Sequence, residues 1–94
     1  MEMMEHMDIF YNSILENPRI STTHISLYMS LLLQWYKQGC KDPFAFRRAD
    51  IMREAKINSR HTYNKCMNEL QSNGLVRYRP ASNRATRSNI LFVI

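Results

Sequence analysis

The sequence predicts a single, mainly α-helical domain with a small β-hairpin near its C-terminal end. Three observations predict this fold class. Apolar residues recur at steps of three and four through most of the chain up to Asn73, and the spacing then changes to alternation. A chain of 94 residues is also too short for two hydrophobic cores. With only two glycines, it lacks the composition of a glycine-rich phosphate-binding loop.

The N-terminal segment, residues 1–17, contains a predicted amphipathic helix over residues 3–15. Its apolar side chains follow one stripe, which consists of Met3, Met7, Phe10 and Ile14 and is widened by Met4, Tyr11 and Leu15. The helix ends at Asn17, because Pro18 disfavours helical geometry in the residue that precedes it. We expect this helix to pack on the rest of the domain or to mediate dimerisation.

The helical core, residues 22–74, begins with the strongest helix signal, over residues 22–38. A hydroxyl side chain at residues 21–23 can cap this helix, and Gly39 ends it. Nearly every position is apolar except for one narrow stripe of Thr23, Ser26, Ser30, Gln34 and Lys37. Because a small domain covers only one side of such a helix, we expect a homodimer through this helix and the N-terminal one. The alternative is a monomer in which the first helix packs within the same chain.

A short strand and a second helix follow. Phe44 and Phe46 alternate around Ala45, which favours a very short strand. The next predicted helix, residues 48–55, begins without a good capping residue, because Arg47 stands where Ser, Thr or Asp would be expected. In the tight connector that follows, we expect Ile57 to be buried.

The last helix and the hairpin complete the prediction. The helix covers residues 59–73, is capped by Asn58 or Ser59 and ends before Gly74. Its inward stripe consists of Thr62, Tyr63, Cys66, Met67 and Leu70. Residues 75–79 alternate and predict a strand, residues 80–88 a basic loop, and residues 89–94 a second strand, so that residues 75–94 form a hairpin.

The charge of the chain is unevenly distributed. The formal net charge is +5, yet residues 1–46 carry three basic and five acidic residues, whereas residues 47–94 carry ten basic and three acidic residues. A strongly cationic half indicates a polyanionic partner, most simply nucleic acid. The simpler alternative is a solvated basic face with no partner.

Several classes of site are excluded by the residues at hand. Cys40 and Cys66 are too few for a disulfide scaffold and lack metal-site spacing. Three isolated histidines without paired carboxylates predict neither a metal site nor acid–base catalysis, so we expect no enzyme activity and no cofactor. No apolar run is long enough to span a membrane, and acidic residues near Met1 do not fit a signal peptide. We therefore expect a cytoplasmic protein with no membrane partner.

From Thr22 to Ile94 the chain resembles the winged helix-turn-helix family. Residues 51–55 resemble the helix before the turn, and residues 57–63 resemble the turn and the start of the recognition helix, within a helix-turn-helix over residues 48–73. Residues 67–76 resemble the family's segment of helix end, glycine and first wing strand, and residues 77–87 resemble a basic wing. The chain is also similar to small winged-helix proteins of bacterial mobile elements, often labelled as transcriptional regulators.

The resemblance implies double-stranded DNA as the partner and a set of contacting residues. The recognition helix would present Ser59, Arg60, His61, Asn64, Lys65 and Asn68 to the major groove. Arg60 suits guanine and Asn64 suits adenine, whereas Lys65 suits a phosphate. The other predicted contacts are Arg47 and Arg48 at the start of the preceding helix and Arg77, Arg79, Arg84 and Arg87 in the wing.

The function implied is that of a DNA-binding transcriptional regulator. Two alternatives remain open. One is a DNA-binding accessory factor for the replication or excision of a mobile element. The other is a winged-helix module that binds protein and not DNA, which would expose an apolar patch on the wing side and bind its partner independently of salt.

Overall fold

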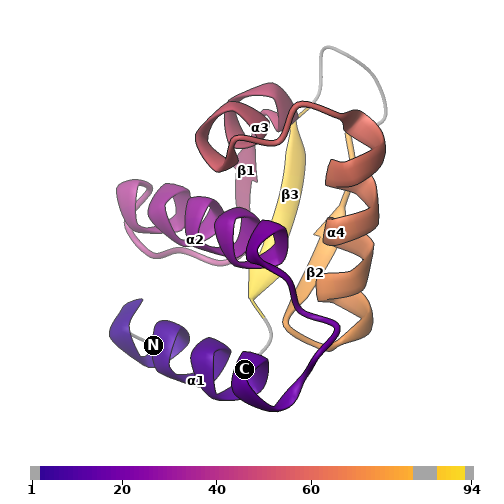
Figure 1. Cartoon of the computed structure of the whole chain (residues 1–94). Helices are drawn as coiled ribbons and strands as arrows, with labels where there is room; N and C mark the ends of the chain where they lie inside the picture. Colours follow the sequence, from indigo (N-terminus) through magenta and orange to yellow (C-terminus); the bar gives the residue numbers. More distant parts are fainter. Residues whose placement is uncertain (1–2, 82–86, 93–94) are drawn as a thin grey trace.

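The computed structural model describes residues 3–81 and 87–92. This part of the chain folds into four helices and three strands (Figure 1). In chain order they are α1 (Met3–Glu16), α2 (Thr22–Lys37), β1 (Phe44–Phe46), α3 (Arg48–Ala55), α4 (Arg60–Ser72), β2 (Val76–Arg79) and β3 (Ser88–Phe92). The prediction of a mainly helical chain with a small β-structure is confirmed, and the described elements lie within two residues of the predicted ranges. Residues 93–94 of the last predicted strand lie outside the described part.

The sheet has three antiparallel strands in the order β1-β3-β2. β3 is the central strand: it pairs with β2, where Val76 lies opposite Phe92, and with β1, where Phe44 lies opposite Ile90. The sequence predicted the short strand but not its partner. A two-stranded hairpin is only marginally stable by itself. Pairing with β1 adds a third strand and provides backbone hydrogen-bond partners for the second edge of β3.

The helices cover one face of this sheet (Figure 1). Along β3 the side chains of Ser88, Ile90 and Phe92 are buried, whereas the alternate positions are partly exposed. Along β2, Val76 and Tyr78 face inward. Since successive side chains of a strand point to opposite faces, Arg77 and Arg79 lie on the outer face of the sheet.

The core forms around α2, which supplies the fully buried Leu27, Leu31 and Leu32. Phe92 of β3 connects the helices to the sheet, because its ring lies 5.3 Å from that of Tyr28 and 5.8 Å from that of Trp35. It also lies 5.8 Å from the ring of Phe44 in β1. This aromatic cluster therefore joins α2 to the central strand β3 and to the edge strand β1.

α1 contacts the domain along a narrower stripe than the sequence predicts. Phe10 is completely buried, and Met7 and Ile14 are partly buried. By contrast, Met4, Tyr11 and Leu15 are 70%, 42% and 82% exposed. The wider stripe was wrong as a description of the packed face, because α1 lies at one end of the molecule, where there is little else to cover it (Figure 1).

The polar stripe of α2 lies against α3. The Ser26 hydroxyl donates a hydrogen bond of 2.6 Å to the carbonyl oxygen of Ala55, and the Gln34 amide donates to the carboxylate of Glu54 at 2.8 Å. Ser30 is buried and bonds back to the Ser26 carbonyl oxygen. The stripe thus forms a polar contact between two helices.

The turn between α3 and α4 has the predicted features. Arg47 precedes α3 without a side-chain capping bond, and Ile57 is buried. Ser59 caps α4, because its hydroxyl oxygen accepts from the backbone N–H of Thr62 at 3.3 Å. Gly74, with a φ of 74°, follows the end of α4 in the left-handed region that glycine adopts cheaply.

In the described ranges, every helix is too short or too polar to cross a bilayer.

Candidate nucleic-acid interface

The outer face of α4 carries most of the predicted contact residues. His61, Asn64, Lys65 and Asn68 are exposed and follow one another at steps of three, one and three, which keeps them on one face. The opposite face buries Tyr63, Cys66, Met67 and Leu70. The predicted division of this helix into inward and outward residues is therefore confirmed for these positions.

Arg60 and Ser59 lie at the beginning of α4, and both are exposed. Arg60 precedes Gln71 by eleven residues, which at about 100° per residue places the two on the same side of the helix. That side faces β2, because the amide oxygen of Gln71 accepts from the backbone N–H of Tyr78 at 2.7 Å. Arg60 therefore lies at the edge of the outer face of α4, on the side of the helix that Gln71 turns to β2.

A chain of hydroxyl groups joins α4 to the hairpin. The Tyr63 hydroxyl donates to the Tyr78 hydroxyl at 3.1 Å, which lies 3.2 Å from the Ser88 hydroxyl. The backbone N–H of Ala81 also donates to the Ser88 oxygen at 3.2 Å. Burial raises the pKa of Tyr63 well above its ordinary value, and the Tyr78 contact adds to this effect, so the phenol stays protonated. These bonds hold α4 at a defined position relative to both strands.

Three arginines gather at one end of the sheet. Phe46 pairs with Ser88 and Arg79 with Asn89, so the ends of all three strands meet there. Arg47 directly follows Phe46, and Arg87 directly precedes Ser88, and both are exposed. Figure 1 shows α3 and the beginning of α4 at this same end of the molecule. Arg84, another predicted contact, lies outside the described residues.

Arg77 lies apart from the outer face of α4. It is exposed on the outer face of the sheet, on the side away from the helices. Together with Arg79 it lines an open hollow of about 470 Å³, whose other walls include Pro43, Asn89 and Leu91. The predicted wing arginines thus divide into an end group, Arg79 and Arg87, and Arg77 farther along the sheet.

The cations of α3 differ in their surroundings. Arg48, at the first position of the helix, is partly exposed and exerts an electrostatic effect that lowers the pKa of Tyr63, opposing the larger effect of burial. Arg53 lies 3.3 Å from the carboxylate of Asp50 in the same helix, and both side chains are largely exposed. Such a surface pair contributes little to stability.

The opposite end of the molecule carries exposed apolar residues. The large apolar side chains that are exposed in the described ranges all belong to α1 and α2: Met4, Ile9, Tyr11, Leu15, Leu33 and Tyr36. Figure 1 shows α1 at the end away from α3 and the beginning of α4. The two ends of the fold therefore differ in chemistry, with arginines at one and uncovered apolar residues at the other.

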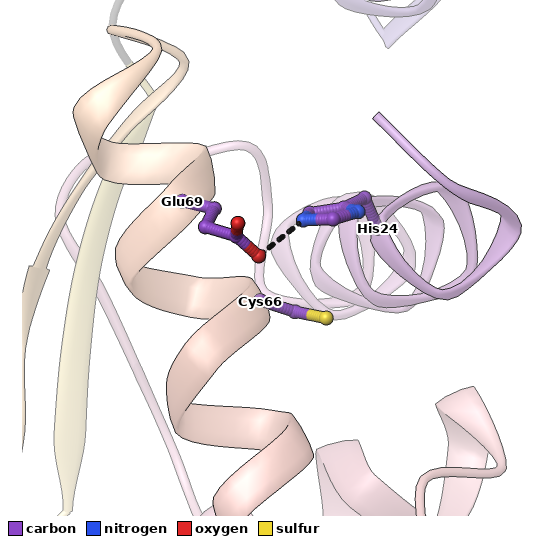
Figure 2. A group of neighbouring side chains, drawn as sticks. All are labelled: His24, Cys66 and Glu69. Atoms are coloured by element: carbon purple, nitrogen blue, oxygen red, sulfur yellow. Dashed lines mark hydrogen bonds and ion pairs between the residues drawn. The ribbon is translucent and has the colours of Figure 1, made fainter. Parts of the chain in front are cut away.

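The structure also groups three residues from distant parts of the sequence. His24 of α2 lies beside Cys66 and Glu69 of α4, and their ligand atoms all lie within 4.8 Å of one another (Figure 2). His24 and Cys66 are buried. The prediction of an isolated histidine is wrong for His24, because the 41 residues between His24 and Cys66 leave no spacing signal in the sequence.

A comparison with protein-family models finds no match for this chain, and comparisons with curated proteins and with solved structures find none either.

Proposed function

We propose that this protein binds double-stranded DNA as a transcriptional regulator, with α4 in the major groove. The observation that carries the proposal is the exposed face of His61, Asn64, Lys65 and Asn68, which lies next to Arg60 and has no large apolar side chain. A helix of this composition can donate to and accept from base edges and phosphates.

The arrangement of elements supports a winged helix-turn-helix interpretation. α3 and α4 are joined by a short turn, and the β2–β3 hairpin follows α4 directly. The strand ends that carry the three arginines lie at the same end of the molecule as the beginning of α4 (Figure 1). In this interpretation Arg47, Arg79 and Arg87 contact phosphates on either side of the groove that α4 enters.

The distribution of apolar residues favours DNA over a protein partner at this surface. A protein-binding module would be expected to expose aromatic or aliphatic side chains there. Among the described residues, the exposed large apolar side chains lie on α1 and α2 instead. The alternative role as an accessory factor in replication or excision uses the same DNA contacts and differs only in its target site.

We also propose a homodimer formed through α1 and α2. Met4 and Leu15 of α1 and Leu33 and Tyr36 of α2 are large apolar residues that are exposed in the described part of the chain. Covering this surface with a second copy would give a dimer with two α4 helices. Two-fold symmetry in the protein then requires a palindromic target.

The test is binding to duplex DNA over a range of salt concentrations. We expect affinity to fall steeply with salt, because bound cations displace counterions from the phosphates. The exchange Lys65→Ala should lower the slope of log affinity against log salt by about one, as for one lost phosphate contact. The matched control is Lys41→Ala, which removes the same charge from the loop after α2 and should leave the slope unchanged.

Selection from randomised DNA tests the role of α4 in sequence recognition. We expect Asn64→Ala to relax the preference at one base position and to cost about 1–3 kcal/mol in binding to the best site. A salt-independent affinity, or equal effects of Lys65→Ala and Lys41→Ala, would contradict DNA binding through α4.

A further inference from the structure

His24, Cys66 and Glu69 bring together three different ligand types between α2 and α4. Cys66 and Glu69 are three residues apart, so both extend from the same face of α4. Figure 2 shows them directed toward α2, where the imidazole of His24 lies opposite Glu69. Nε2 of His24 is 3.0 Å from Oε1 of Glu69, and the sulfur of Cys66 completes a group within 4.8 Å.

We propose that these three side chains form a binding site for Zn²⁺. Zinc accepts sulfur, imidazole nitrogen and carboxylate oxygen together, at about 2.0–2.3 Å in tetrahedral geometry. A thiolate ligand disfavours Mg²⁺ and Ca²⁺, which prefer oxygen. Three protein ligands leave one coordination position for water. The ion can reach the site from solvent beside Glu69, because the Glu69 side chain is 40% exposed whereas that of His24 is 6% exposed.

The hydrogen bonds of His24 define where its proton lies. The backbone N–H of Ser21 donates to Nδ1 at 3.0 Å, so Nδ1 is an acceptor and the neutral ring carries its proton on Nε2. This Nε2–H donates to the Glu69 carboxylate. The bond points at the position that a metal ion would take between the two residues.

Metal binding requires the proton to move to Nδ1, and an acceptor is already in place. The hydroxyl oxygen of Ser21 lies 2.8 Å from Nδ1. It can accept the Nδ1–H bond while Nε2 binds the ion, as metal-bound imidazoles commonly donate from their other nitrogen. In that state Nδ1 no longer accepts from the Ser21 N–H, so metal binding exchanges this backbone hydrogen bond for the bond to the Ser21 hydroxyl.

The cysteine supplies the proton that is released. Cys66 is a free, buried thiol beside the Glu69 carboxylate. On binding, the thiol loses one proton to solvent, a sulfur–zinc bond forms, and the ion compensates the charges of both the thiolate and the carboxylate.

The decisive experiment uses Co²⁺ as a spectroscopic substitute for zinc in the Cys40→Ser variant. The sequence has two cysteines, and Cys40 is exposed outside the site. In this variant Cys66 is the only thiol, so a thiolate-to-cobalt charge-transfer band must arise from it. We expect this band together with the intense visible bands of tetrahedral cobalt, saturating at one ion per chain and abolished by Zn²⁺.

Further measurements test the other ligands and the supporting contact. Zn²⁺ should raise the melting temperature of the Cys40→Ser protein, and a chelator should reverse the effect. Glu69→Gln keeps an acceptor for His24 but removes the charge, and Ser21→Ala removes the acceptor for Nδ1. We expect metal affinity to fall at least about tenfold in each, whereas the surface exchange His61→Ala should leave it unchanged.

Absence of the charge-transfer band in Cys40→Ser, or a zinc affinity equal in Glu69→Gln and His61→Ala, would overturn the proposal. It would then follow that the three residues form only a buried hydrogen-bonded contact between α2 and α4. None of these measurements involves DNA, so their outcome is independent of the proposed function.

Discussion

The ring of Phe10 in α1 stacks on the ring of Tyr28 in α2, with centroids 3.9 Å apart and planes 4° from parallel. Phe10 is completely buried, and Tyr28 in turn contacts Phe92 of β3 at 5.3 Å. One aromatic series therefore connects the first helix to the central strand of the sheet. Phe10 is the fully buried residue in the contact of α1 with the domain.

We expect Phe10→Ala to destabilise the protein by about 3 kcal/mol, because it removes a buried aromatic ring and leaves a cavity beside Tyr28. Urea unfolding followed by circular dichroism measures this change. The control is Asn12→Ala on the same helix, where the side chain is exposed and polar and the effect should stay within about 0.5 kcal/mol. Equal effects of the two exchanges would mean that α1 does not pack on α2.

The contact between α2 and α3 depends on Ser26. We expect Ser26→Ala to cost about 1–2 kcal/mol, because the carbonyl oxygen of Ala55 loses its 2.6 Å bond in a partly buried place. Thermal or urea unfolding measures the loss. Ser13→Ala removes a hydroxyl bond of similar type, but from an exposed position within α1, and should have a much smaller effect.

Alkaline pH should destabilise the fold through Tyr28 and Tyr63. Burial raises the pKa of both phenols above the ordinary value of about 10, which the unfolded chain retains. Above that pH the unfolded state has lost protons that the folded state keeps, so the free energy of unfolding falls as pH rises. Each tyrosine contributes a slope of up to about 1.4 kcal/mol per pH unit in this range.

The variant Tyr28→Phe tests this pH dependence. Its free energy of unfolding should decline less steeply than that of the wild type between about pH 10 and 11.5. In this variant only the Tyr63 phenol still holds a proton in the folded state that the unfolded state loses. Below about pH 9 the two curves should run parallel. Curves that stay parallel over the whole range would show that Tyr28 is not the group responsible.

The proposed dimer makes a prediction about α1. We expect sedimentation equilibrium to give a dimer for the wild type and a monomer for Leu15→Glu, because a charge at an apolar interface must be desolvated. Asn12→Glu introduces the same charge at an exposed polar position of α1 and should remain dimeric. A monomeric wild type would refute the dimer, and it would favour recognition of a single DNA site.

Much of the fold could be predicted because its signals are local. The helix over residues 48–55, the cap at Ser59, the buried Ile57 and the division of α4 into two faces all follow from the spacing and chemistry of neighbouring residues. The candidate interface was predictable in the same way, since exposed positions on α4 follow from the buried ones. The concentration of cations after residue 46 is likewise a property of the sequence alone.

Other features depended on contacts between residues far apart in the chain. Periodicity reports which side chains share a face, but not which element that face meets. For this reason the sequence could not show that β3 pairs with β1, that Ser26 contacts Ala55, or that Leu15 stays exposed.

The same limit of periodicity explains why the sequence predicted the outer face of α4 but not the group of His24, Cys66 and Glu69. By itself the sequence determined a basic helix with a defined outer face, because a helix repeats every few residues. Only the tertiary structure decided that Arg77 lies apart from that face and that His24 meets Cys66 and Glu69. Those relationships arise from the packing of α2 and the sheet against α4, in which the hydrophobic core brings distant segments together.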